Sequence, residues 1–346
     1  MAAHQAPPSL GFSRRVEEGY TVALFPEGTR SVDGTIGRFH KGAFYLAEQL
    51  QLDILPLVIY GAGMVSPKRT GFHIRRGWLV TRTLARVKAD DTTFGENYRE
   101  QAKAYRKLFC AEYEALQAKY GVTENPWFRQ TVLGNYIYKS PVQEWYMRVK
   151  LPLDGYYRLW NRLIPRRARV TDVGCGLGQM ATMLSLLGPE RTLVGLDYDE
   201  EKILQASHSH LSSERLQFRL FDMRYDSLPE SDVFLFNDSL HYIAAESQRA
   251  VLHRAVEALS DGGMILVRDG DASRDEKRHE AILRTERWST RILRFNRTDE
   301  ALHFVDREFM MHFAEEEGLS LRIEACDRTT SETMYILTKS EKHGRV

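Results

Sequence analysis

Short apolar runs recur between residues 168 and 340, and most are separated by segments in which apolar positions return every three or four residues. Short runs predict buried strands, and the longer spacing predicts amphipathic helices. Strands are expected at residues 192–196, 216–220, 233–236, 264–268, 320–325 and 333–338, after an earlier one that runs into Asp172. Helices are expected at residues 180–187, 199–208, 246–259 and 306–317, and a turn is expected at residues 261–263. Strands that alternate with helices in this way predict an α/β fold with a parallel sheet.

The first 122 residues have a different pattern. Strands are expected at 20–25, 54–59 and 78–87, and helices at 43–50 and 97–120, the second ended by Gly121. We interpret the aromatic stripe of that second helix as core, with a ligand surface as the alternative. Asp33-Gly34 is a turn signal, and Asn125-Pro126 marks a boundary. The chain is therefore predicted to have three parts: residues 1–122, a helical linker at 123–167, and residues 168–340.

A glycine-dense turn follows the first strand of the C-terminal part. Its glycines are Gly174, Gly176 and Gly178, and acids flank it at Asp172 and at Asp197, where the next strand ends. Glycine lets a backbone turn sharply and approach a ligand, which is expected at the carboxyl ends of parallel strands. A dinucleotide site would read G-x-G-x-x-G, but position 179 is Gln, and the Asp172 carboxylate would repel a pyrophosphate. The pattern instead suits a cationic amino group at Asp172 and ribose hydroxyls at Asp197.

This D-x-G-x-G-x-G pattern resembles motif I of the class I S-adenosylmethionine-dependent methyltransferases, and the resemblance covers roughly residues 168–339. It implies a Rossmann-like sheet with flanking helices and S-adenosylmethionine (SAM) as cofactor. The further cofactor-binding positions that it implies are Asp222, Met223 and Asn237. A polar insertion at 272–304, which contains His279 and Glu286, is expected to cover the methyl acceptor.

His241 is the candidate catalytic base, because it follows the strand that ends beside the transferable methyl group in this family. A base is needed only if the acceptor is a hydroxyl or a phenol. The alternative is a histidine that packs or donates hydrogen bonds near the pocket. We see no metal-ligand constellation in the sequence and expect a metal-independent enzyme.

A second recognisable string, FPEGTRS, lies near the N-terminus and is followed by FHKGA and ILPLVIYG. It closely resembles the glycerolipid acyltransferases that use 1-acylglycerol-3-phosphate. The resemblance assigns Glu27, Gly28, Thr29 and Arg30 to the acceptor-phosphate motif and places Pro56 in the motif that follows. The family's His-x-x-x-x-Asp dyad is missing, since His40, for example, is followed at that distance by Tyr45. We therefore expect a partial acyltransferase domain at 1–122, either a remnant or a piece of a longer protein, that is inactive alone.

The segment between residues 127 and 169 is rich in aromatic residues and arginines. The aromatic members are Tyr136, Tyr138, Trp145, Tyr146, Tyr156, Tyr157 and Trp160. We interpret the segment as helices that cap a methyltransferase pocket. A basic amphipathic surface that lies in a membrane interface is the alternative, and both roles are compatible.

Composition narrows the possible partners. The chain has 346 residues, three cysteines far apart in sequence and a net charge of +1, which does not favour nucleic-acid binding. The N-terminus lacks a signal-peptide pattern, so a cytoplasmic protein is expected, with peripheral attachment to the inner membrane as the alternative.

The combination of the two resemblances in one chain is similar to bacterial fusions of an exporter-like membrane part, an acyltransferase and a methyltransferase. They imply methyl transfer to a small lipid-like or acyl/aryl-derived acceptor, with a membrane surface or a membrane-embedded protein as partner. The competing hypothesis is a non-catalytic scaffold that binds a lipid phosphate.

Overall fold

The computed structural model describes residues 8–31, 34–68, 74–137, 139–153, 155–270, 302–325 and 332–340. Asp33, Tyr138, Cys326 and most of the expected insertion at 272–304, including His279 and Glu286, lie outside these ranges. The chain divides into two compact units, Met1–Trp127 and Phe128–Val346, and each is described by itself.

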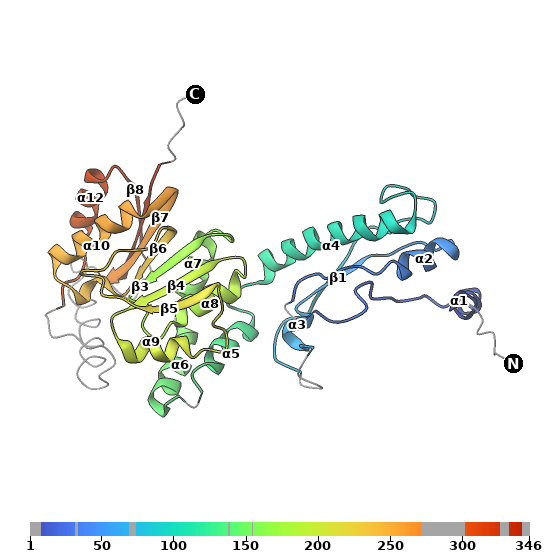
Figure 1. Ribbon diagram of the computed structural model, residues 1–346, viewed down its shortest axis with the longest axis horizontal. Coiled ribbons are helices and arrows are strands. Elements are labelled where there is room, and N and C mark those ends of the chain that lie inside the picture. Colours follow the sequence, from blue (N-terminus) through green and yellow to red (C-terminus); the bar gives the residue numbers. More distant parts are fainter. Residues whose placement is uncertain are drawn as a thin grey trace, which may run out of the picture. The chain divides into compact units, whose positions relative to one another are not determined.

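The C-terminal unit contains a seven-stranded sheet in the order β5-β4-β3-β6-β7-β9-β8 (Figure 1). Its strands are β3 (Arg169–Val173), β4 (Thr192–Asp197), β5 (Leu216–Leu220), β6 (Ser231–Asn237), β7 (Leu259–Gly270), β8 (Ser320–Ala325) and β9 (Glu332–Thr338). The first five are mutually parallel, and β9 is antiparallel to both of its neighbours. The chain order reverses direction between β3 and β6, which is the switch point where such sheets bind ligands. The predicted α/β class is confirmed.

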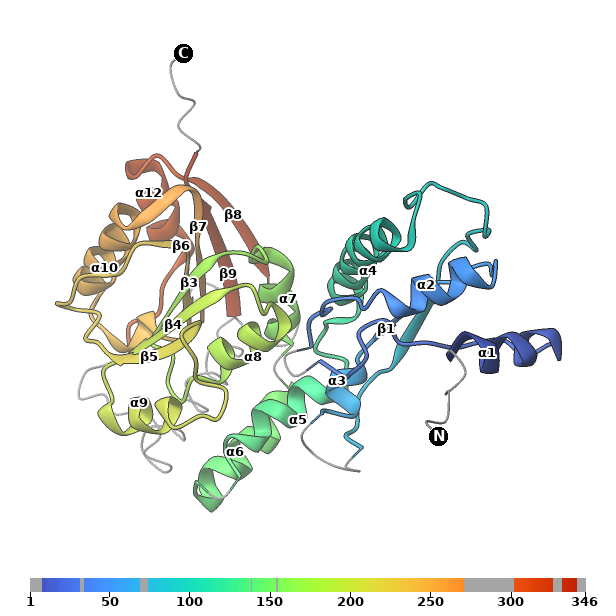
Figure 2. The same cartoon turned by 45° about the vertical axis from the view of Figure 1, so that its right-hand side comes forward.

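Helices cover both faces of this sheet (Figure 2). They are α8 (Gln179–Leu187), α9 (Glu200–Ser207), α10 (Ala245–Glu257) and α12 (Arg307–Glu316), with a short 3-10 turn η1 (Leu240–Tyr242) after β6. A large apolar core joins α10 and α12 to one face of the sheet, where Phe234, Phe236 and Val267 are fully buried. Because side chains alternate along a strand, Asp172, Asn237 and Arg268 project to the opposite face, where α8 lies.

One predicted turn is instead part of a strand. The turn expected at residues 261–263 lies inside β7, which extends from Leu259 to Gly270. Gly262 has a φ of 73°, and the pairing of β7 with β6 changes register between Ser231 and Val233. Leu259 lies opposite Ser231 and Met264 lies opposite Val233, so β7 has three residues more than β6 over this interval. A glycine signal that predicts a turn is therefore also compatible with an irregularity inside a continuing strand.

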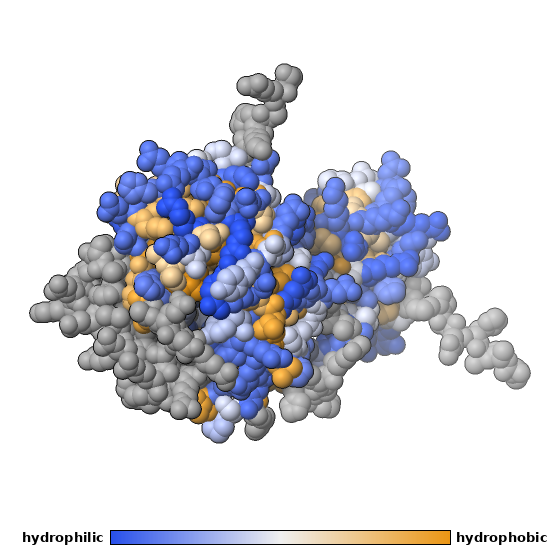
Figure 3. Space-filling view, turned by 60° about the vertical axis from the view of Figure 1, so that its left-hand side comes forward, coloured by the Kyte–Doolittle hydropathy of each residue, from blue (hydrophilic) through white to orange (hydrophobic). Residues whose placement is uncertain are grey.

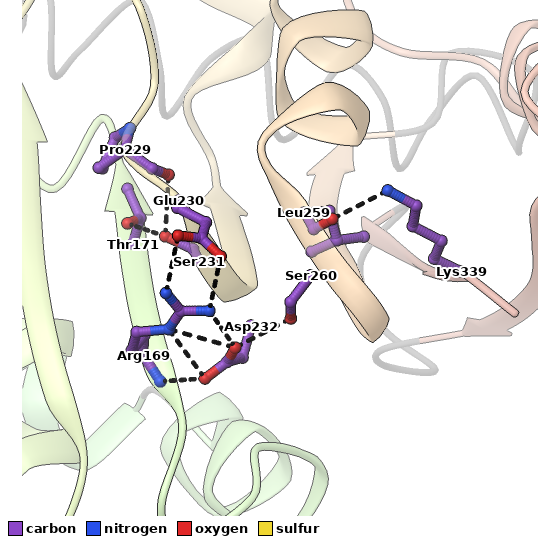
Figure 4. Close-up of polar contacts among 9 residues, drawn as sticks. All are labelled: Arg169, Thr171, Pro229, Glu230, Ser231, Asp232, Leu259, Ser260 and Lys339. Atoms are coloured by element: carbon purple, nitrogen blue, oxygen red, sulfur yellow. Dashed lines mark hydrogen bonds and ion pairs between the residues drawn. The ribbon is translucent and has the colours of Figure 1, made fainter. Parts of the chain in front are cut away.

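The amino ends of the central strands are joined by polar side chains (Figure 4). The Arg169 guanidinium contacts Asp232 at 2.8 Å and Glu230 at 3.3 Å, and the Thr171 and Ser231 hydroxyls lie 2.7 Å apart. The Arg169 side chain holds the pKa of Asp232 below its usual range. These contacts hold β3 against β6 at the amino ends of the strands, away from the glycine turn at the carboxyl end of β3.

Three consecutive helices come directly before β3 in the chain: α5 (Pro126–Gly134), α6 (Pro141–Leu153) and α7 (Tyr156–Leu163). On α7, Tyr157 and Trp160 are buried, whereas Trp145 on α6 is 54% exposed. In the described part of the chain, the helices are all too short or too polar to cross a bilayer. The described surface in Figure 3 is mainly hydrophilic and is interrupted by several hydrophobic patches.

The N-terminal unit packs a long helix against a small sheet. Its elements are α1 (Pro8–Glu17), α2 (Gly42–Gln49), β1 (Leu57–Tyr60), α3 (Ala62–Val65), β2 (Val80–Thr83) and α4 (Tyr98–Tyr120). The Asn97 side chain caps α4 by accepting hydrogen bonds from the backbone of Arg99 and Glu100. On α4, Tyr105 is buried and contacts the rings of Phe44 and Phe94. The prediction that the aromatic stripe forms core is confirmed.

The strand expected at residues 20–25 is wrong. This stretch is irregular, and Tyr20 and Phe25 are 60% and 77% exposed. The expected strand at 54–59 is shorter, since regular pairing begins at Leu57, and Ile54 forms only an isolated bridge to Val87. Pro56 lies between them and has no N–H to donate to a ladder.

Candidate functional site

The glycine turn lies at the carboxyl end of β3, and all three of its glycines have positive φ, at 77°, 56° and 76°. A Cβ on Gly174 would lie 2.3 Å from the Cβ of Ser239, and a Cβ on Gly178 would lie 2.3 Å from the Phe218 ring. Both positions therefore require glycine for conformation and for space. Gly176 differs, because a Cβ there would meet no atom within 4 Å. The turn is thus packed on two sides and open at Gly176.

Asp197 joins this turn to the end of β4. One carboxylate oxygen accepts a hydrogen bond of 2.7 Å from the Gly176 N–H, and the other accepts one of 3.0 Å from the Asp199 N–H. The side chain is 6% exposed. A carboxylate offers about four lone-pair sites, so two hydroxyl donors still find acceptors here.

Asp172 is almost fully buried beneath the turn. Its carboxylate accepts a hydrogen bond from the backbone of Ala181 in the first turn of α8. Oδ2 has no hydrogen-bond partner among the described residues. Burial, together with the charge of Asp197, raises the pKa of Asp172 to about 7. Two buried carboxylates at one turn repel each other, and a cationic ligand would relieve that repulsion.

Asp222 follows β5 and lies nearer to solvent. Both of its oxygens contact the Arg224 guanidinium, the shortest distance being 2.7 Å, and this ion pair holds the pKa of Asp222 below its usual range. Met223 beside it is buried, and its Cε would lie 3.4 Å from a Cβ on Gly174. Met223 therefore reaches the glycine turn from a third strand end, and Asp222 precedes it in the chain.

Asn237, the last residue of β6, lies in a polar network with α7. Its side-chain oxygen accepts from the Trp160 indole at 3.1 Å and from Arg268 at 3.4 Å. The Arg268 guanidinium lies 3.5 Å from the centroid of the Tyr156 ring and 3.3 Å from the Asp238 carboxylate. This network fixes α7 over the carboxyl ends of β6 and β7.

His241 lies in η1, which follows β6, and has a partner that the sequence did not reveal. Its Nδ1 is 2.7 Å from the carboxylate of Asp269, the penultimate residue of β7. The same carboxylate accepts from the backbone N–H groups of His241 and Gly270. Burial raises the pKa of Asp269, and the neighbouring His241 opposes that rise. The imidazole stacks on Phe304 at 5.0 Å.

The signal that could have found Asp269 is its place at a strand end. β6 and β7 are adjacent and parallel, so acids that end β7 lie next to residues that follow β6. The second acid of the Asp269-Gly-Asp271 stretch lies outside the described residues.

In the N-terminal unit, the FPEGTR stretch forms a compact turn. The Glu27 carboxylate accepts a 2.7 Å hydrogen bond from the Gly37 N–H, and Gly28 has a φ of 67°. The exposed Arg30 guanidinium donates to the hydroxyl and the carbonyl of Ser66, at 2.9 and 3.2 Å. Thr29 is exposed. Glu27 therefore supports the turn, and Arg30 presents its cation at the surface.

The order β5-β4-β3-β6-β7-β9-β8 and the acid-flanked glycine turn define a Rossmann-like fold of the class I methyltransferase type. Residues 170–263 match the family model "Methyltransferase domain", and residues 9–60 match the model "Acyltransferase". The chain thus carries a class I methyltransferase domain in its C-terminal unit and an acyltransferase region in its N-terminal unit.

Individual relatives match only parts of the chain. A chloroplastic 1-acyl-sn-glycerol-3-phosphate acyltransferase of Brassica napus is 44% identical over 52 residues, or 15% of each chain. The 1-acyl-sn-glycerol-3-phosphate acyltransferase of Limnanthes alba is 31% identical over 31% of this chain and 37% of its own. The chain therefore spans well under half the length of these relatives. Human N-acetylserotonin methyltransferase with SAM aligns at 20% identity and a TM-score of 0.43, covering 59% of this chain and 58% of that structure.

Proposed function

We propose that the C-terminal unit binds SAM at the carboxyl ends of β3 and β4 and transfers its methyl group to a small acceptor. The acceptor that we favour is lipid-like or an acyl- or aryl-derived small molecule. The observation that carries this proposal is the pair of buried carboxylates, Asp172 and Asp197, beside an open position at Gly176. SAM supplies an electrophilic methyl group on a sulfonium, together with an ammonium and two ribose hydroxyls.

Each part of the site has a proposed task. Asp172 attracts the cationic end of SAM, and its Oδ2 offers an acceptor that the described residues leave unused. Asp197 accepts the ribose hydroxyls, Asp222 and Met223 bind the adenine, and Asn237 lies beside the methyl group. Gly174, Gly176 and Gly178 allow the backbone to approach SAM closely. Asp222 would bind the adenine amine while still paired with Arg224, since a carboxylate accepts several hydrogen bonds.

For an oxygen acceptor, we propose His241 as the general base. With Nδ1 held by Asp269, the proton of the acceptor hydroxyl would pass to Nε2. The Asp269 carboxylate would orient the ring and stabilise its protonated form. We propose that this step needs no metal ion. Among the described residues, no group of three or more His, Cys, Asp or Glu side chains is arranged to hold a metal.

For the N-terminal unit, we propose anion binding without acyl transfer by this chain alone. The surface cation of Arg30 next to Ser66 supports an anion site, because guanidinium, hydroxyl and turn backbone together suit a phosphate. This observation also favours the second candidate function, a scaffold that holds a lipid phosphate. The three-part division at residues 122 and 167, and attachment to a membrane surface or a membrane protein, remain part of this proposal.

Titration calorimetry of Asp197→Ala with SAM tests the main proposal. Loss of a hydrogen bond to a charged group costs about 1.5–3 kcal/mol, so affinity should fall roughly 10- to 150-fold. Asp232→Ala is the matched control, because it removes a carboxylate at the opposite ends of the strands (Figure 4). Unchanged affinity in Asp197→Ala, or an equal loss in both variants, would show that the cofactor site is assigned wrongly.

A further inference from the structure

The connector between α5 and α6 touches both helices that flank β4. In the connector, the Asn135 side chain accepts from the Ser209 hydroxyl at 3.1 Å, and the Lys139 ammonium donates to the Gln205 carbonyl at 2.5 Å. Both partners belong to α9 or to the turn after it. Between these two contacts, Tyr136 reaches the glycine turn, where its hydroxyl donates a 2.7 Å hydrogen bond to the Leu177 carbonyl.

The Tyr136 hydroxyl is well placed to remain a donor. The residue is 2% exposed, and burial raises its pKa far above the usual value, so the phenol stays protonated. The Thr182 hydroxyl, on the second turn of α8, also hydrogen-bonds Tyr136. The phenol therefore joins the glycine turn to α8 through one oxygen atom.

The bond to Leu177 fixes the orientation of one peptide group. Leu177 lies between Gly176 and Gly178, both with positive φ, and glycine-flanked peptides rotate with little steric resistance. In a trans peptide the C=O and the following N–H point in opposite directions. With the Leu177 C=O directed at Tyr136, the Gly178 N–H points away from it and donates to the Cys175 carbonyl at 2.9 Å. One tyrosine hydroxyl thus selects the orientation that closes the turn.

The neighbouring amide in the same turn serves the cofactor site directly. The Gly176 N–H donates to Asp197, the carboxylate that the proposed function assigns to ribose. If the 177–178 peptide rotated, the turn bond from Gly178 to Cys175 would be lost, and Gly176 would no longer be held opposite Asp197. The rotation would therefore weaken cofactor binding before it weakened the pairing of the strands in the sheet.

We propose that Tyr136 is a positioning residue for the cofactor, which it serves by holding the glycine turn in its binding conformation. Tyr136 lies outside residues 170–263, the stretch matched by the methyltransferase model. The proposal rests on SAM being the ligand of this turn. If the proposal is right, the helical segment that precedes the sheet contributes a residue to the cofactor site.

The test is Tyr136→Phe, which removes only the hydroxyl, with Thr171→Val as control. Thr171 also donates or accepts a buried hydroxyl hydrogen bond, to Ser231 at the opposite ends of the strands (Figure 4). Tyr136→Phe should weaken SAM binding about 3- to 10-fold by calorimetry, while turnover at saturating SAM stays within about twofold. Thr171→Val should bind SAM as the unmodified chain does, whatever it loses in thermal stability.

Hydrogen exchange of the ligand-free proteins separates this inference from the proposed function. Tyr136→Phe should speed exchange of the Gly176 and Gly178 amides, and Thr171→Val should not. If the unmodified chain fails to bind SAM, the proposed function fails, and the exchange comparison still decides whether Tyr136 holds the turn. Unchanged exchange in Tyr136→Phe overturns the inference, as does unchanged SAM affinity in a chain that binds SAM.

Discussion

Asp172→Asn should make the ligand-free protein more stable at neutral and alkaline pH while weakening its cofactor site. The substitution keeps the shape and an acceptor for the Ala181 N–H, and it replaces the unpartnered oxygen Oδ2 by an amide group. It also removes one of two buried negative charges, since Asp197 contributes to the raised pKa of Asp172. A residue that costs stability in the absence of ligand is expected where a cationic ligand completes the charge balance.

The sign of the pH dependence follows from the raised pKa. Asp172 ionises near pH 4 in the unfolded chain and near pH 7 in the folded one, so over this window the native state holds a proton that the unfolded state releases. The contribution of Asp172 to the free energy of unfolding therefore falls as pH rises from about 4 to about 7, and it is constant above that. At about 1.36 kcal/mol per pKa unit, the interval corresponds to at most roughly 4 kcal/mol at pH 8.

Chemical denaturation between pH 4 and pH 8 measures this difference. The two proteins should be nearly equally stable at pH 4, and Asp172→Asn should be the more stable at pH 8, by up to roughly 4 kcal/mol. Calorimetry should show SAM affinity rising between pH 6 and pH 8 in the unmodified chain only, as Asp172 ionises. Asp232→Asn, a carboxylate with a lowered pKa, should lose stability instead. A stability difference that does not grow with pH would refute the reasoning.

Two further predictions concern buried charges. Arg191→Met should destabilise the fold by about 3–5 kcal/mol in chemical denaturation, because it leaves several buried carbonyls without a hydrogen-bond donor. Arg167→Met, which removes an exposed ion pair, should cost under about 1 kcal/mol. His241→Ala should slow methyl transfer to an oxygen acceptor about 10²- to 10⁴-fold with SAM affinity intact, and Asp269→Asn should show part of that loss. Full turnover in both would exclude His241 as the base.

The sequence predicted the parts of the site that depend on local chemistry. The spacing of Gly174, Gly176 and Gly178 reports the backbone conformation itself, and acids at the ends of apolar runs report strand ends. Asp269 and Tyr136 were missed because the roles proposed for them depend on which elements are neighbours. Asp269 is brought to His241 because β7 pairs with β6, and Tyr136 is brought to Leu177 by the α5–α6 connector. Residues 20–25 show the opposite error, since an apolar run becomes a strand only when another strand pairs with it.

The aromatic and basic linker divides into two physically different parts. On α7, two arginines hold the helix on the sheet: Arg268 lies under the Tyr156 ring, and the buried Arg191 donates to the carbonyls of Asn161, Ile164 and Pro165, where the helix ends. Cations are favourable at a helix C-terminus because they satisfy its unpaired carbonyls. Tyr157 and Trp160 of α7 are therefore part of the interior of the C-terminal unit, and the cap role stays a prediction.

α6 differs from α7 in what its aromatic and apolar residues contact. It buries Met147 and Leu151 on one side and exposes Val142, Trp145 and Val149 by 47%, 54% and 41%. Residues three and four positions apart share a helix face, so these three form a single exposed stripe. If the C-terminal unit contacts a membrane or a membrane protein, α6 rather than α7 carries the apolar surface for it, because the ring of Trp160 is already fully buried against Asn237.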